Sequence, residues 1–241
     1  MLTHVSLFTG IGGLDLAAEW AGFETILQVE MDDYANKVLE KHWPDVPRIK
    51  DIRDVNRESV SEPITVISGG FPCQPFSLAG KRGGRTDDRY LWPSMLRVIR
   101  ELRPAWIVGE NVRGIVTDKI IDSICDDLEN EKYTVAPPLV LPAIAFGIPF
   151  IGYRTFVVAS AAGQLGEKRI WDYKNGEEKI PKEHRRKVQT DGMDPLSRVY
   201  GSPHGIPHRV DRLRCLGNAV VPKQAYPIFQ AIAEVENHDV A

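Results

Sequence analysis

The residue of this sequence best suited to covalent chemistry is Cys73, within the segment GGFPCQPFS at residues 69–77. The apolar, β-branched residues 64–67 predict a buried strand, which the glycine pair and the two prolines are expected to end in a turn. Because ligands bind at the carboxyl edge of a parallel sheet, this position makes the thiol a candidate nucleophile. A cysteine considered alone is more commonly a small buried apolar residue, so position alone leaves both interpretations open.

Three acidic side chains come at the ends of predicted strands: Glu30, Asp51 and Glu110. Glu110 follows the strand one βα unit beyond Cys73, so both are expected on one edge of the sheet, where Glu110 could face the ligand that Cys73 attacks. Asp51 could accept an amino group. For Glu110 and Asp51, position alone is explained equally well by a solvated loop acid.

A glycine-rich turn, TGIGG at residues 9–13, links a predicted strand at residues 4–8 to a helix that begins at Leu14. Glycine lets a ligand approach the backbone, and the free N–H groups of a helix N-terminus favour an anionic group. Glu30 lies about 20 residues further on, where an acid holds ribose hydroxyls. The turn alone is explained equally well by a tight structural turn, but with Glu30 it indicates an adenosine-bearing cofactor. A dinucleotide fingerprint requires a small residue where this chain has Asp15, which weakens the case for NAD.

Two regions of the chain concentrate basic residues. The first is a glycine-rich stretch at residues 79–89, interpreted either as a lid that closes on a phosphate-bearing substrate or as a solvated linker. The second begins at residue 160 and interleaves basic residues with Trp171 and Tyr173, which indicates a nucleic-acid contact surface or a solvated loop. His204 and His208 have no obvious cysteine or carboxylate partners, so no metal site is expected.

Composition places the chain among ordinary globular proteins. Its 241 residues can form one large core, and the net charge of −3 confines any nucleic-acid surface to a local patch. Three widely spaced cysteines argue against a disulfide framework, and no apolar run is long enough to span a membrane, so a cytoplasmic protein is expected. Short apolar strands alternating with amphipathic helices predict an α/β fold with a doubly wound, mostly parallel, Rossmann-like sheet.

Four stretches, in this order, resemble motifs of the DNA (cytosine-5) methyltransferases that use S-adenosylmethionine. They are SLFTGIGGLDLAAEWAGFE from residue 6, GGFPCQPFSLAGKRGG from residue 69, GENVRG from residue 109 and GNAVVP from residue 217. The ordered set extends over most of the chain and favours a nucleophilic role for Cys73 over a buried one. The chain thus resembles a compact member of that family with a short target-recognition region.

The resemblance implies a role for each residue of the catalytic motifs. Cys73 would add to carbon 6 of a flipped cytosine, and Glu110 would donate to ring nitrogen 3, while Asn111 would hold its turn. Arg154 would contact the flipped base. Around Arg154 the family has a Gln-x-Arg-x-Arg motif, but this chain has Phe150 in place of the glutamine and Gly152 in place of the first arginine.

The same resemblance, together with the strand-end positions, assigns two further sets of residues. Contacts with S-adenosylmethionine, or with its product S-adenosylhomocysteine, are expected from Phe8, Thr9, Gly10, Ile11, Gly12, Gly13, Leu14, Glu30, Met31, Asp51, Ile52, Gly70, Pro72, Leu91, Asn218 and Val220. Contacts with DNA are expected from Gln74, Ser77, Lys81, Arg82, Arg85, Arg89, Arg209 and Arg212.

We therefore expect methyl transfer to carbon 5 of cytosine in double-stranded DNA by a monomer with no membrane partner. Residues 1–159 and 216–241 would form the catalytic domain, and residues 160–215 the target-recognition region. RNA, as in the tRNA-methylating relatives of the family, is an alternative substrate. A second alternative is a regulatory or DNA-binding subunit without activity, which the short recognition region and the altered arginine motif favour.

Overall fold

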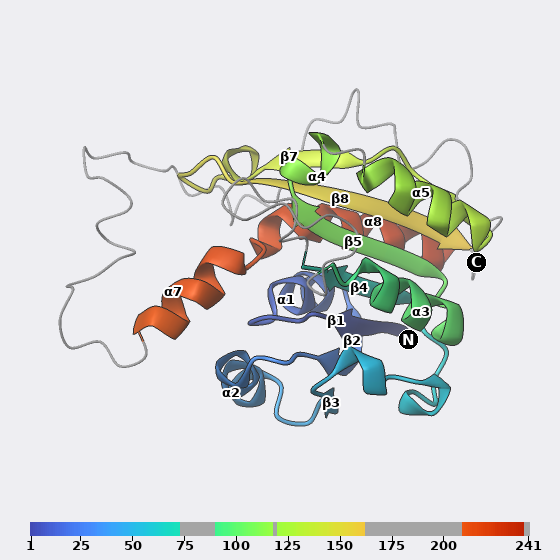
Figure 1. Ribbon diagram of the computed structural model, residues 1–241, viewed down its shortest axis with the longest axis horizontal. Helices are drawn as coiled ribbons and strands as arrows, with labels where there is room; N and C mark the ends of the chain where they lie inside the picture. Colours follow the sequence, from blue (N-terminus) through green and yellow to red (C-terminus); the bar gives the residue numbers. More distant parts are fainter. Residues whose placement is uncertain (73–89, 118–119, 162–208, 239–241) are drawn as a thin grey trace.

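A computed structural model describes residues 1–72, 90–117, 120–161 and 209–238 of the chain (Figure 1). Eight strands are found in these ranges: β1 Leu2–Leu7, β2 Phe23–Val29, β3 Arg48–Ile49, β4 Val66–Gly70, β5 Trp106–Val112, β6 Tyr133–Val135, β7 Leu139–Pro142 and β8 Tyr153–Ala161. The α-helices in the same ranges are α1 Gly13–Trp20, α2 Asp33–His42, α3 Trp92–Leu102, α4 Gly114–Thr117, α5 Ile120–Asn130, α7 Arg209–Asn218 and α8 Pro222–His238. Short 3-10 helices are η1 Ile52–Asp54, η2 Arg57–Ser59 and η5 Ala143–Phe146.

All eight strands belong to one sheet, in the order β3-β2-β1-β4-β5-β8-β6, with β7 paired to β8. Strands β1 to β5 are parallel, whereas β8 runs antiparallel to β5, β6 and β7. The chain moves outward from β1 to β3 and then returns to β4 on the other side of β1. A crevice for ligands is expected at this reversal, beyond the carboxyl ends of β1 and β4.

Helices cover both faces of the sheet, and the alternation of side chains along each strand decides which face each residue meets. In β5, Ile107 belongs to the core shared with α3 and α5, whereas Trp106 and Val108 belong to the core shared with α1 and α8. Figure 1 shows α3 and α5 in front of the sheet and α8 behind it. The predicted α/β fold class, with a mostly parallel sheet, is confirmed.

Several predicted boundaries were wrong, and the errors have a common cause. Gly69 and Gly70 continue strand β4 instead of ending it, because both pair with β5 in regular parallel register. Glu110 and Asn111 likewise lie within β5, where the antiparallel neighbour β8 extends the pairing to Val112. Propensity places glycine and acidic residues outside strands, but hydrogen bonds to two neighbouring strands override that preference.

Two further elements differ in extent from the sequence-based expectation. Strand β8 continues to Ala161, and helix α7 runs without interruption from Arg209 to Asn218, through residue 215. The final motif, GNAVVP at residues 217–222, forms the end of α7, a short connection and the start of the long helix α8. The third predicted strand is reduced to Arg48–Ile49, since Asp51 caps the 3-10 helix η1.

Candidate active site

The candidate active site lies at the carboxyl edge of the parallel strands, where the glycine-rich turn follows β1 and Pro72 follows β4. The backbone of this turn has left-handed φ angles at Phe8 (52°), Gly10 (59°) and Gly12 (84°). A Cβ atom added to Gly13 would lie 2.6 Å from the carbonyl oxygen of Val220. The turn that begins α1 therefore needs glycine at residue 13 to accommodate the connection between α7 and α8.

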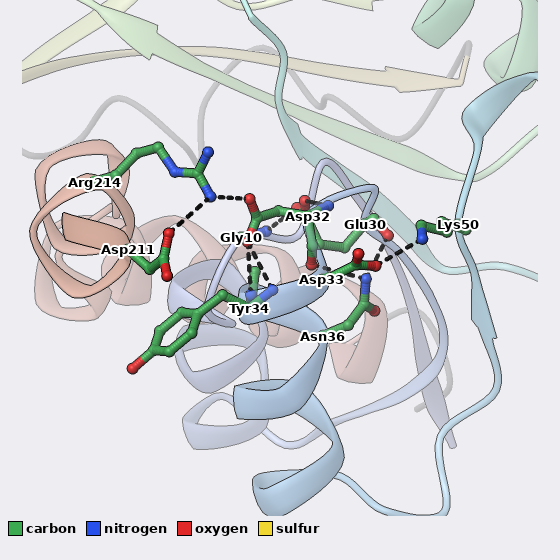
Figure 2. A network of polar contacts seen from close by, with 10 residues as sticks. Gly10, Glu30, Asp32, Asp33, Tyr34, Asn36, Lys50, Asp211 and Arg214 are labelled. Carbon is green, nitrogen blue, oxygen red and sulfur yellow. Dashed lines mark hydrogen bonds and ion pairs between the residues drawn. The ribbon is translucent and has the colours of Figure 1, made fainter. Parts of the chain in front are cut away.

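Glu30 directly follows β2 and holds the glycine-rich turn by its carboxylate. One oxygen, Oε2, accepts a 2.6 Å hydrogen bond from the backbone N–H of Gly10, and Oε1 accepts a 2.7 Å bond from the N–H of Asp32. The side chain of Asn36 donates to the carbonyl of Glu30 at 2.7 Å, which fixes the backbone at this point. Figure 2 shows these contacts converging at the end of β2.

The other residues assigned to the cofactor lie in different surroundings. Met31, next to Glu30, is exposed at 63%, whereas Ile52 is exposed at 6% and belongs to the core beneath α3. Asp51 accepts hydrogen bonds from the Arg53 side chain at 3.0 Å and 2.5 Å, and these hold the pKa of Asp51 down at about 2. Met31 is therefore accessible to a ligand, Asp51 is 26% exposed and paired with Arg53, and the side chain of Ile52 supports the core.

Glu110 lies near the carboxyl end of β5 and faces Arg154 of β8. The Arg154 Nε and Glu110 Oε1 atoms are 2.9 Å apart, with side-chain exposures of 18% and 9%. Burial raises the pKa of Glu110 to about 7, although the positive charge of Arg154 acts in the opposite direction. Arg154 also donates to the carbonyl oxygen of Ala219 at 3.2 Å, which ties this pair to the connection between α7 and α8.

Asn111 and Gly70 position the segment that leads to Cys73. The Asn111 side chain donates a 2.8 Å hydrogen bond to the carbonyl of Phe71, and an added Cβ at Gly70 would lie 2.8 Å from Glu110 Oε2. The Leu91 N–H bonds to the Pro72 carbonyl at 3.5 Å, so the chain returns to the same place after residue 89. Hydrogen bonds from Asn111 and Leu91 therefore hold Phe71 and Pro72 where the chain leaves β4.

Several predicted site residues lie outside the described residues: Cys73, Gln74, Ser77, Lys81, Arg82, Arg85 and Arg89. Arg209 and Arg212 belong to α7, but their side chains also lie outside the described part. Of the remaining cofactor residues, Thr9, Leu14 and Val220 are buried, Phe8, Ile11 and Leu91 are partly buried, and Asn218 is exposed at the end of α7.

Sequence reasoning missed the buried carboxylate of Asp15, which was considered only as a departure from the dinucleotide fingerprint. Asp15 is fully buried and accepts hydrogen bonds from Ser6 Oγ at 2.8 Å and Gln28 Nε2 at 2.9 Å, so it joins α1 to β1 and β2. Burial raises its pKa to about 6. The sequence signal was an acid on the side of α1 that faces the sheet.

The altered arginine motif has a local packing explanation. A Cβ atom added to Gly152 would lie 2.3 Å from the ring of Phe150, so the two departures from the family pattern occur as a compatible pair. Phe150 itself is exposed at 51%.

In the part of the chain that the structure describes, no helix is long and apolar enough to cross a membrane. The same ranges contain no cluster of histidine, cysteine and acidic side chains that could hold a metal ion.

Comparison with known proteins gives a consistent result. A sequence model of the C-5 cytosine-specific DNA methylase family matches residues 2–198. The chain is 36% identical over 180 residues to the type II methyltransferase M.AquIA of Picosynechococcus, covering 66% of this chain and 72% of that protein. It is 35% identical over 162 residues to M.Eco47II of Escherichia coli, covering 65% of this chain but only 39% of the relative.

Among solved structures, the chain resembles one described as a DNA modification methyltransferase encoded within a prophage of Escherichia coli. The TM-score is 0.58 at 30% identity, over 67% of this chain and 47% of that one. The family match extends over most of the sequence and includes Glu30, which follows β2, and the strands that contain Gly70 and Glu110. The chain therefore belongs to the C-5 cytosine-specific DNA methylase family.

Proposed function

We propose that this protein transfers a methyl group from S-adenosylmethionine to carbon 5 of cytosine in DNA. The observation that carries the proposal is the buried pair of Glu110 and Arg154, one strand away from the segment that ends at Pro72 and continues into Cys73. A carboxyl group with a pKa of about 7 is able to share a proton with a ring nitrogen near neutral pH.

The reaction uses the chain's own side chains in sequence. The Cys73 thiolate adds to carbon 6 of the cytosine ring, and the electron pair displaced from the ring makes carbon 5 nucleophilic. Glu110 shares its proton with ring nitrogen 3, which stabilises the charge that this addition creates. After carbon 5 has accepted the methyl group, a base removes the carbon-5 proton, the bond between sulfur and carbon 6 breaks, and the thiolate is released.

The glycine-rich turn and Glu30 are suited to hold the cofactor, which supplies an electrophilic methyl group on a sulfonium. The Glu30 oxygens that accept the Gly10 and Asp32 N–H groups keep further lone pairs for ribose hydroxyls. Met31 offers an exposed apolar surface beside them for an adenine ring. Asp51, on the neighbouring element, is an acceptor for an exocyclic amine.

The substrate we propose is double-stranded DNA from which the target cytosine is flipped, because the carbon-6 position cannot be reached inside a duplex. Residues 1–159 and 216–241 act as the catalytic domain, and residues 160–215 act in target recognition. We propose that Arg209 and Arg212 bind DNA phosphates. We assign the protein to the cytoplasm, where the thiol of Cys73 is kept reduced.

Incubation with labelled S-adenosylmethionine tests this function, with double-stranded DNA and tRNA offered in parallel. We expect 5-methylcytosine in DNA, and its loss in the Cys73→Ala variant. Label in tRNA alone would identify the RNA-methylating alternative. A covalent complex of the wild type on DNA containing 5-fluorocytosine would exclude an inactive regulatory subunit, while the absence of both product and complex would overturn the proposal.

A further inference from the structure

Helix α7 is attached to the cofactor side of the site by an ion pair that involves Arg214. Its guanidinium contacts Oδ2 of Asp32, the N-terminal capping residue of α2, and lies 3.7 Å from Asp211 one turn earlier on α7 (Figure 2). Asp32 and Arg214 are far apart in the sequence, so this contact joins two parts of the chain that the fold brings together. The contact lies at the edge of the turn that carries Glu30.

Asp32 links this ion pair to the proposed cofactor carboxylate through the backbone. Its Oδ1 accepts the N–H groups of Tyr34 and Ala35 at 2.9 Å each, and its own N–H donates to Glu30 Oε1 at 2.7 Å. Glu30 in turn accepts the N–H of Gly10 at 2.6 Å. A continuous chain of contacts therefore runs from Arg214 through Asp32 and Glu30 to the glycine-rich turn.

The positive charge of Arg214 offsets the repulsion between two neighbouring carboxylates. Glu30 and Asp32 place two carboxylates close together at the start of α2, and Arg214 supplies a positive charge beside them. The pKa of the neighbouring Cys215 reflects these charges: burial and the charge of Asp32 raise it, the charge of Arg214 lowers it, and Glu30 raises it further. Lys50, by contrast, pairs with Asp33 at 2.6 Å, outside this chain of contacts.

We propose that Arg214 is a positioning residue for the cofactor site: it docks α7 on the N-terminus of α2 and so holds the Asp32 and Glu30 turn in place. This inference rests on the proposed function, because it takes Glu30 as the ribose ligand. It also connects the end of the target-recognition region to the half of the site that binds cofactor. Arg214 acts through Asp32 and is not itself a catalytic residue.

Calorimetric titration with S-adenosylhomocysteine tests the role of Arg214. The Arg214→Gln and Asp32→Asn variants should each bind about three- to fivefold more weakly than the wild type, the range of a single ion pair of this exposure. Asparagine keeps the helix cap, so Asp32→Asn removes the charge alone. The double variant should be no weaker than either single one, and Arg214→Lys should recover part of the affinity.

A matched control is available in Arg100, which pairs with Glu131 at 2.6 Å and is exposed at 52%, against 55% for Arg214. Arg100→Gln should bind S-adenosylhomocysteine like the wild type. In steady-state assays, Arg214→Gln should raise KM for the cofactor with little change in kcat, whereas a general loss of folded protein would lower the apparent kcat instead.

A second measurement follows α7 directly. Hydrogen exchange quantified by peptide mass spectrometry should be faster in the α7 peptide that contains Cys215 in Arg214→Gln than in the wild type, with the α5 peptide that contains Cys125 unchanged. Affinities of Arg214→Gln within 1.5-fold of the wild type, or additive effects in the double variant, would overturn the inference alone. If the wild type bound no S-adenosylhomocysteine, the proposed function would fail and this inference with it.

Discussion

Glu30 and Glu110 each come at the carboxyl end of a parallel strand, yet their surroundings differ. Glu30 follows β2 and accepts backbone N–H groups at 2.6 and 2.7 Å. Glu110 lies inside β5, is almost fully buried and faces the guanidinium of Arg154 at 2.9 Å. The first carboxylate is bound by neutral dipoles near its own turn, and the second by a cation from an antiparallel strand.

This difference shows how one sequence signal leads to two kinds of chemistry. Two backbone N–H groups fix the Glu30 carboxylate in place, which suits an acceptor of ribose hydroxyls. Burial favours the protonated form, and at Glu110 it outweighs the opposing charge of Arg154. The neighbours, which come from elsewhere in the sequence, therefore decide whether a strand-end acid accepts hydrogen bonds or shares a proton.

The largest effect is expected from Glu110→Gln. An amide cannot release a proton to ring nitrogen 3, so the single-turnover methylation rate should fall by about 10²- to 10⁴-fold, the usual range for a general acid. The affinity for S-adenosylhomocysteine, measured by calorimetry, should stay within twofold of the wild type. A variant that methylates at more than a tenth of the wild-type rate would contradict the proposed proton sharing.

Glu30→Gln should show the opposite pattern. Glutamine keeps one oxygen, which can accept only one of the two N–H groups of Gly10 and Asp32 in the present geometry. Its amide NH2 group replaces the second oxygen and faces the other N–H donor, so the turn loses a charge-assisted hydrogen bond. Cofactor affinity should fall about 10- to 100-fold, which corresponds to ~1.5–3 kcal/mol for bonds to a charged group. The methylation rate at saturating cofactor should change little; an equal loss in both quantities would remove the distinction between the two acids.

The pH dependence of methylation should separate the same two acids. Because burial raises the pKa of Glu110 to about 7, its protonated form is present below this pH and is lost as the pH rises. The single-turnover rate should therefore fall by about tenfold per pH unit well above 7, and this limb should be absent in Glu110→Gln. The linked free energy of unfolding also decreases as the pH rises from 4.5 toward 7, since the native state holds the proton more tightly.

Much of this arrangement could be predicted from the sequence, because the relevant signals are local. Apolar strands and amphipathic helices in alternation indicated the α/β fold, and the order of the motifs placed Gly10, Glu30 and Glu110 on one edge. The family resemblance was confirmed by the match over residues 2–198. These features depend on short windows of sequence and on the regular handedness of βα units.

The contacts that distinguish the two acids could not be predicted in the same way. Arg154 reaches Glu110 only because β8 runs antiparallel to β5, and the ion pair of Arg214 with Asp32 joins two helices that are far apart in the sequence. Asp15 was noted for its position in the motif, but its buried bonds to Ser6 and Gln28 depend on how α1 packs on the sheet. Each contact joins residues whose proximity is set by tertiary packing.

The smallest expected effects come from two glycines, one beside each acid. An added Cβ at Gly70 would lie 2.8 Å from Glu110 Oε2, so Gly70→Ala should displace the carboxylate and lower the methylation rate by about three- to tenfold, more than it lowers cofactor affinity. Gly10 has open space around it but a φ of 59°, so Gly10→Ala should cost about 1 kcal/mol of stability through backbone strain.

Thermal unfolding and single-turnover assays on both variants separate packing from strain. Gly70→Ala should affect the reaction more than the stability, since its backbone lies in regular parallel pairing with β5. Gly10→Ala should affect the stability and cofactor binding more than the rate at saturating cofactor. The backbone strain falls on residue 10, whose N–H donates to Glu30. The reverse pattern would mean that Gly70 supports the cofactor turn and that the two halves of the site are not independent.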